Sequence, residues 1–274
     1  MKNRIPLMIV LTIIYACVIT SRSFSLFVNP IERPVIQFGM DSTMVDSLLN
    51  HKLETSRFLF RYSAKFRYAD QLQSRVSSYE SFCDTVSHIL QLPKSTLKTP
   101  IYLYADSVEQ LLCFKGWSAL RENQAFTGPN EIHANGLGAI EHEIVHVLAN
   151  NLIAYAKSVF FAEGIEQYVE IVRSDEVFRK DLRIAKKFIS KPWDKWANDT
   201  IGFWATGEDE SIVVAYPVSG LFVKFLLQHS NLEIFKEFYR AIRTEVSTEA
   251  AFYKIYKYPL SKAISDFKKD ILSW

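Results

Sequence analysis

Gly138-Ala-Ile-Glu-His142-Glu143-Ile-Val-His146-Val-Leu148 contains the pattern H-E-x-x-H. On a helix of about 3.6 residues per turn, positions four apart lie on nearly the same face. His142 and His146 can therefore direct both imidazoles at one point. Glu143 projects to the side, where it can reach a water molecule beside a metal ion rather than the ion itself. The spacing thus predicts a metal-binding helix with a general base.

The residues around this pattern are mostly apolar, as Ile140, Ile144, Val145 and Leu148 illustrate. A helix that is apolar nearly all round is expected to be buried, and buried His and Glu side chains need partners. About 0.009 matches to the pattern are expected by chance in a chain of this composition. We therefore prefer a metal site to a surface helix that carries two unrelated histidines.

A third ligand is needed, and the next acidic residue along the chain is Glu163. The intervening segment can end the first helix, turn at Asn150-Asn151 or at 155–157, and return in a second helix. A third histidine of the metzincin type is excluded, because Ala149 and Leu152 occupy the Gly and His positions of that pattern.

H-E-x-x-H followed by Phe160-Phe-Ala-Glu163-Gly-Ile-Glu-Gln-Tyr168 resembles the gluzincin metallopeptidases, the thermolysin-like zinc peptidase superfamily. The resemblance implies that Glu163 is the third ligand of one zinc ion. Gln167 replaces the Asp of the thermolysin branch, so the chain is closer to the E-G-x-A-x-Y branch with its uncharacterised members, although Glu166 replaces a small residue common there. The alternative is that Glu163 is a carboxylate favoured by a helix N-terminus.

The resemblance covers roughly residues 100–272, with specific motifs only at 142–146 and 163–168. It implies that 100–274 is an α+β, mainly α, thermolysin-like domain with a small mixed sheet and a helical C-terminal lobe. Strands are expected at 101–104, from β-prone content, and at 130–134. By resemblance, 130–134 is the sheet edge that holds an extended peptide by strand addition. His133 then lines the cleft or, alternatively, packs in the core.

The same resemblance implies a Tyr or His after the third ligand that donates a hydrogen bond to the developing oxyanion. Tyr216, in Ala215-Tyr216-Pro-Val-Ser219, is the predicted donor. The alternatives are that Tyr216 is an ordinary core tyrosine or that His229 is the donor. Residues 190–209, rich in tryptophan, are interpreted as either a lid or a packed loop.

The N-terminus has the plan of an export signal: Lys2 and Arg4 precede an apolar run from Ile5 to Ile19. Residues 1–25 are therefore predicted to be an export signal or an N-terminal anchor, with Cys17 as a candidate lipidation site. The run is short for a membrane span, which needs about 20 residues. We expect the protein in the cell envelope or secreted, with possible membrane association only through this segment.

Residues 26–99 are predicted to be a linker followed by a helical extension. Helix is expected over 41–92, begun by a cap at Asp41 or Ser42 and ended before Pro93. Cys83 and Cys113 can pair in an oxidising compartment or remain buried free thiols.

The expected activity is that of a zinc-dependent peptidase acting on a peptide or protein substrate. A net charge of +2 without a basic run gives no reason to expect nucleic acid as a partner. Two alternatives stay open: a non-enzymatic envelope protein that retains the fold, and a metal-dependent hydrolase of a non-peptide amide. Aminopeptidase activity is not predicted, because the G-x-M-E-N pattern that holds a free amino terminus is absent.

Overall fold

The computed structural model describes residues 39–95, 98–115, 120, 122–128, 130–198 and 209–274. The chain divides into two compact units, Met1–Met40 and Asp41–Trp274. β1 (Gly39–Met40) is the described part of the first unit. The predicted export segment, Cys17 and the linker prolines lie outside the described residues. Among the helices that the structure describes, none combines the length and apolarity needed to cross a membrane.

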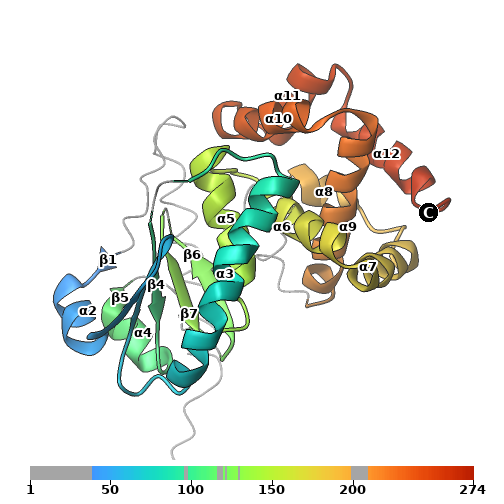
Figure 1. Cartoon of the computed structure of the whole chain (residues 1–274). Coiled ribbons are helices and arrows are strands. Elements are labelled where there is room, and N and C mark those ends of the chain that lie inside the picture. Colours follow the sequence, from blue (N-terminus) through green and yellow to red (C-terminus); the bar gives the residue numbers. More distant parts are fainter. Residues whose placement is uncertain (1–38, 96–97, 116–119, 121, 129, 199–208) are drawn as a thin grey trace, which may run out of the picture. The chain divides into compact units, whose positions relative to one another are not determined.

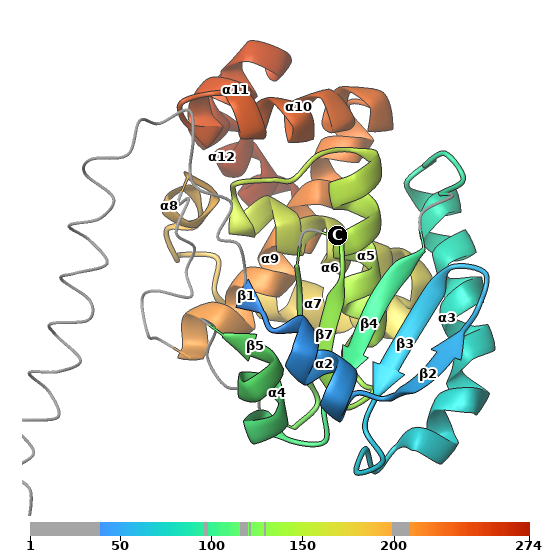
Figure 2. The same cartoon turned by 90° about the vertical axis from the view of Figure 1, so that its left-hand side faces the viewer.

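The second unit contains a mixed five-stranded sheet in the order β2-β3-β4-β7-β6, and Figure 2 shows β2, β3, β4 and β7 side by side. The inner pairs β3–β4 and β4–β7 are parallel, whereas the outer pairs β2–β3 and β6–β7 are antiparallel. The strands are β2 (His51–Glu54), β3 (Phe58–Tyr62), β4 (Thr99–Leu103), β6 (Gln124–Thr127) and β7 (Ile132–Asn135).

Both faces of the sheet are covered, so β7 is buried along its whole length. α3 (Ala69–Ile89) lies on one face and α2 (Ser42–Leu48) and α4 (Ser107–Cys113) lie on the other, as Figure 1 shows. Successive side chains of a strand point to opposite faces of the sheet, so each strand contributes apolar residues to both helical layers. β5 (Phe114–Lys115) follows α4 directly.

The predicted helix over 41–92 is wrong at residues 49–68, which contain β2 and β3 instead. Phe58 and Phe60 are both buried on the face that packs against α3. Apolar residues two positions apart indicate a strand, whereas the apolar residues of the flanking segments recur at helical spacing. The cap at Asp41 is confirmed, because its side chain accepts a hydrogen bond from the Met44 amide.

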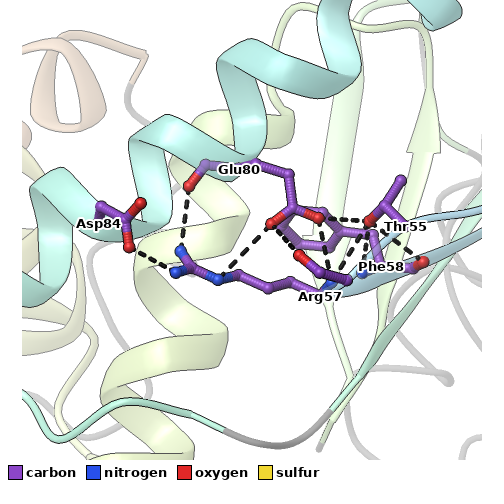
Figure 3. A network of polar contacts seen from close by, with 6 residues as sticks. Thr55, Arg57, Phe58, Glu80 and Asp84 are labelled. Carbon is purple, nitrogen blue, oxygen red and sulfur yellow. Dashed lines mark hydrogen bonds and ion pairs between the residues drawn. The ribbon is translucent and has the colours of Figure 1, made fainter.

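A polar network ties the β2–β3 turn to α3. The Arg57 guanidinium pairs with Asp84 and donates to the Glu80 carbonyl oxygen at 3.0 Å. The Glu80 carboxylate accepts hydrogen bonds from the Thr55 and Ser56 hydroxyls and from the Arg57 amide. Figure 3 shows Arg57 extended between these two acidic residues of α3. We call Thr55, Ser56, Arg57, Glu80 and Asp84 the arginine network.

The remainder of the second unit is helical, and α6 packs most extensively against α9. Asn231 and Ser247 cap α10 and α11, and Pro217 lies inside α9. Cys83 and Cys113 are both buried free thiols. The helices are α5 (Ile140–Leu152), α6 (Val159–Arg173), α7 (Asp175–Lys187), α8 (Trp193–Asn198), α9 (Asp209–His229), α10 (Leu232–Thr244), α11 (Thr248–Tyr256) and α12 (Leu260–Asp270).

The described chain is therefore α+β and mainly α, with a small mixed sheet beside a helical lobe, as predicted. Sheet and lobe meet at α5, which packs on β6 and β7 and also contacts α6. The predicted metal ligands lie on these two helices.

Candidate metal centre

α5 and α6 place the three predicted ligands around one point. α5 continues through Asn150-Asn151, and the chain turns between Ile153 and Ser158 before α6 begins. Of the two predicted turn positions, the structure therefore has the later one. Because His142 and His146 are one helical turn apart, both imidazoles face α6, where Glu163 lies in the first half of the helix.

The ligand atoms converge closely. The Nε2 atoms of His142 and His146 are 3.0 Å apart. Glu163 Oε2 lies 3.2 Å from His142 Nε2 and 3.4 Å from His146 Nε2. Of the His, Cys, Asp and Glu groups in the described residues, these three form the one cluster that could hold a metal ion.

The distances fit a tetrahedral zinc site. Ligand atoms at about 2.0–2.1 Å from a tetrahedral ion are about 3.3–3.4 Å from one another. Glu163 Oε2 is buried and accepts no hydrogen bond of regular geometry, although both Nε2 atoms are near it. The two Nε2 atoms, 3.0 Å apart, need either a proton or a cation between them. Both observations are compatible with a cation at this point.

The electrostatics of the cluster favour positive charge. Burial opposes protonation of His142, but the Glu166 and Glu163 carboxylates outweigh it and raise its pKa well above 6.5. Burial likewise opposes protonation of His146, and Glu163 again raises the pKa. Burial alone would raise the pKa of Glu163, but the two imidazoles hold it far below its usual value. The Glu163 carboxylate therefore stays charged and attracts a cation.

Glu166 orients the first ligand. Its Oε2 lies 3.1 Å from His142 Nδ1, and its side chain is almost fully buried. A carboxylate on Nδ1 fixes the imidazole tautomer, so that Nε2 presents its lone pair to the cluster. Glu166, which replaces a small residue of the family pattern, therefore contacts His142 in this chain. The i, i+3 spacing from Glu163 on one helix face is the signal in the sequence that could have found it. We call His142, His146, Glu163 and Glu166 the histidine cluster.

Glu143 is buried beside the histidine cluster and contacts β6. The Thr127 hydroxyl donates to Glu143 Oε2 and lies 3.4 Å from the Glu143 carbonyl oxygen. Nothing in the sequence pattern pointed to Thr127, because its place depends on the register of β6 against β7 and on how α5 packs over the sheet.

Tyr216 of α9 lies next to the cluster, with its ring centroid 6.1 Å from that of His142. Burial, the neighbouring carboxylates and a hydrogen bond with Glu163 raise its pKa above 10, so the hydroxyl keeps its proton.

Glycine residues allow α9 to pack closely against α6 beside Tyr216. A Cβ at Gly164 would lie 3.0 Å from the Ser219 carbonyl oxygen, and one at Gly220 would lie 2.7 Å from the Gln167 side chain.

The other histidines considered from the sequence lie elsewhere. His229 ends α9, thirteen residues beyond Tyr216, which is about 20 Å along a helix. Its Nδ1 is 2.9 Å from the Phe225 carbonyl oxygen. His133 is fully buried, with its Nδ1 2.7 Å from the Tyr104 hydroxyl and its Nε2 3.2 Å from Glu131. His133 is thus a core residue, as its alternative interpretation held.

The prediction that 130–134 forms the sheet edge is wrong. β7 lies between β4 and β6, and β6 is the outer strand on that side of the sheet. The misassignment arose because β6 is short and follows a segment without a clear strand pattern. The edge strand next to Glu143 is therefore Gln124–Thr127.

No protein-family model matches the sequence, and no curated protein matches it significantly. The chemistry of the site therefore has to be inferred from its own residues.

Proposed function

We propose that this chain is a zinc-dependent peptidase with a thermolysin-like, gluzincin arrangement. The observation that carries the proposal is the convergence of His142 Nε2, His146 Nε2 and the buried, hydrogen-bond-deficient Glu163 Oε2 within 3.4 Å of one another. Two imidazoles and one carboxylate are the protein ligands of many catalytic zinc sites, and they leave a fourth position open.

These three residues would hold the ion, and zinc so bound supplies Lewis acidity and lowers the pKa of a water molecule toward about 7. Glu143 takes a proton from the attacking water and passes it to the leaving amine. Tyr216 keeps its proton at neutral pH and donates a hydrogen bond to the oxyanion, a contact worth a few kcal/mol at the transition state. Glu143 and Tyr216, to which these two roles are assigned, both lie next to the histidine cluster.

The substrate of this proposal is an extended peptide paired with β6. Gly128 and Glu131 form a hydrogen-bonded pair, through the Gly128 amide at 2.8 Å. Because such pairs alternate along an antiparallel ladder, the backbone groups of Ala125 and Thr127 point away from β7. In the described part of the chain no further strand pairs there. A peptide added at this edge runs past Glu143.

Export is also proposed, from the charged and apolar N-terminal sequence alone. A fusion of residues 1–30 to a reporter should carry the reporter out of the cytoplasm. A reporter that stays in the cytoplasm would show that this part of the proposal is wrong, without affecting the proposed chemistry.

The deciding experiment compares the zinc-loaded protein with Glu143→Gln and His146→Ala on a peptide library. Glu143→Gln should bind zinc like the wild type and lose turnover by at least about 1,000-fold, because it removes the base and keeps the ligands. His146→Ala should lose both zinc and turnover. His88→Ala, on the far end of α3, is the control and should retain both.

Undiminished cleavage by Glu143→Gln would overturn the mechanism. Zinc binding without cleavage of any peptide would favour the two alternatives, and amide hydrolysis of non-peptide compounds would then separate an enzyme from a binding protein.

A further inference from the structure

The Thr127 side chain of edge strand β6 contacts Glu143. Its hydroxyl donates to Glu143 Oε2 and also approaches the Glu143 carbonyl oxygen, at 3.4 Å. A hydroxyl has a single proton, and a charged acceptor forms the stronger hydrogen bond. The carboxylate oxygen is therefore its main partner.

The contact constrains which oxygen of Glu143 is available. A carboxylate accepts through both oxygens, and here Oε2 is taken by β6. Because Glu143 is also buried, its side chain has little room to rotate. Oε1 is then the oxygen left for the proton of the attacking water.

We propose that Thr127 is a positioning residue that holds the Glu143 carboxylate in its working orientation. The proposal rests on the proposed function of Glu143 as a base. Thr127 lies on the strand to which the extended substrate is proposed to add, so one strand aligns both the peptide and the base. A hydroxyl that acts only through Glu143 affects the chemical step more than the binding of substrate or metal.

The first measurement detects the contact without any turnover. The protein is labelled with ¹³C at glutamate carboxyls, and the Glu143 resonance is assigned by its disappearance in Glu143→Gln. We expect Thr127→Val, which keeps the branched shape suited to a strand and removes the hydroxyl, to shift this resonance. Thr127→Ser, which keeps the hydroxyl, should leave it close to its wild-type position.

The second measurement uses the zinc-loaded variants on the best cleaved library peptide. Thr127→Val should lower kcat by about 10- to 100-fold, the range expected for loss of one hydrogen bond to a charged group. KM and the dissociation constant for zinc should each change by less than about threefold, and Thr127→Ser should restore kcat to within about threefold. Lys52→Val, at an exposed position of β2 on the opposite edge of the sheet, should not change kcat.

An unshifted Glu143 resonance in Thr127→Val would overturn the inference whether or not the protein cleaves peptides. A shifted resonance with unchanged kcat would overturn the positioning role as well. If the wild type binds zinc but cleaves nothing, the proposed function fails, and the positioning role falls with it even where the resonance shows the contact. If Thr127→Val melts at a much lower temperature than Thr127→Ser, the Glu143 resonances of the two variants are compared below the melting temperature of Thr127→Val. The folded form dominates there.

Discussion

The arginine network and the histidine cluster each contain two carboxylates, but the groups that pair with these carboxylates differ. In the arginine network, Glu80 and Asp84 receive donors from Arg57, Thr55 and Ser56. In the histidine cluster, Glu163 and Glu166 face imidazoles, and among the described residues no Lys or Arg pairs with either carboxylate. Arginine and hydroxyl donors of the chain satisfy the first group, whereas the second could hold a metal ion.

The largest expected effect separates the two regions directly. Glu163→Gln should weaken zinc binding by at least about 1,000-fold, or about 4 kcal/mol, because a neutral amide is a poor ligand. Glu80→Gln should leave zinc affinity unchanged and lower the free energy of unfolding by about 1–2 kcal/mol, because its amide nitrogen cannot accept from Ser56 and Arg57. Zinc competition assays and urea unfolding measure the two effects. If Glu80→Gln were to weaken zinc binding as strongly, the distinction between the regions would be lost.

An intermediate effect comes from Asp181, a carboxylate with neither an arginine nor a histidine beside it. Asp181 is 1% exposed and accepts from Gln167 Nε2 at 2.7 Å. Burial raises its pKa from 3.8 to about 6. The folded state therefore binds this proton more tightly than the unfolded state, and stability falls as pH rises from about 4 to about 6, by about 3 kcal/mol.

Asp181→Asn removes this titration. Urea unfolding at pH 4 and pH 7 should show that the variant gains about 3 kcal/mol relative to the wild type between the two values. Asp175→Asn, at an exposed position of the same helix, should show no such gain. An equal pH response in wild type and Asp181→Asn would mean that this carboxyl titrates normally.

The smallest expected effect concerns Glu166. Glu166→Gln keeps an oxygen that can accept from His142 Nδ1 but removes the charge, and zinc affinity should fall about tenfold. Glu170→Gln, one turn further along α6 and paired with Arg173, is the matched control and should retain zinc affinity. If both variants bind zinc like the wild type, Glu166 is a buried partner of His142 without influence on the metal.

Local signals in the sequence predicted the elements and ligands that depend on neighbours along the chain. Asp41 caps a helix through a hydrogen bond to a residue three positions along the chain, and His142 and His146 share a face because of helical geometry. β2 was missed because its exposed residues show no alternation of apolar and polar side chains, although Phe58 and Phe60 of β3 did show it.

The contacts missed at the site depend on tertiary structure. Thr127 meets Glu143 across sixteen positions of sequence, through a sheet register that no local pattern specifies. Glu166 was visible as a helix neighbour of Glu163, but its choice of His142 Nδ1 depends on how α5 and α6 cross. The local pattern therefore identifies the three predicted ligands but not Thr127 and Glu166, which contact the residues of the site.

The two glycines between α6 and α9, Gly164 and Gly220, determine how closely these helices approach beside the candidate site. Glu163 is one residue before Gly164, and Tyr216 is one turn before Gly220, so each lies beside a position where α6 and α9 are too close for a Cβ atom. A single added methyl group exceeds the clearance at either glycine. The Ser219 backbone fixes the approach at Gly164 and the Gln167 side chain fixes it at Gly220, so the distance from the Glu163 carboxylate to the Tyr216 phenol depends on two positions that accept no larger residue.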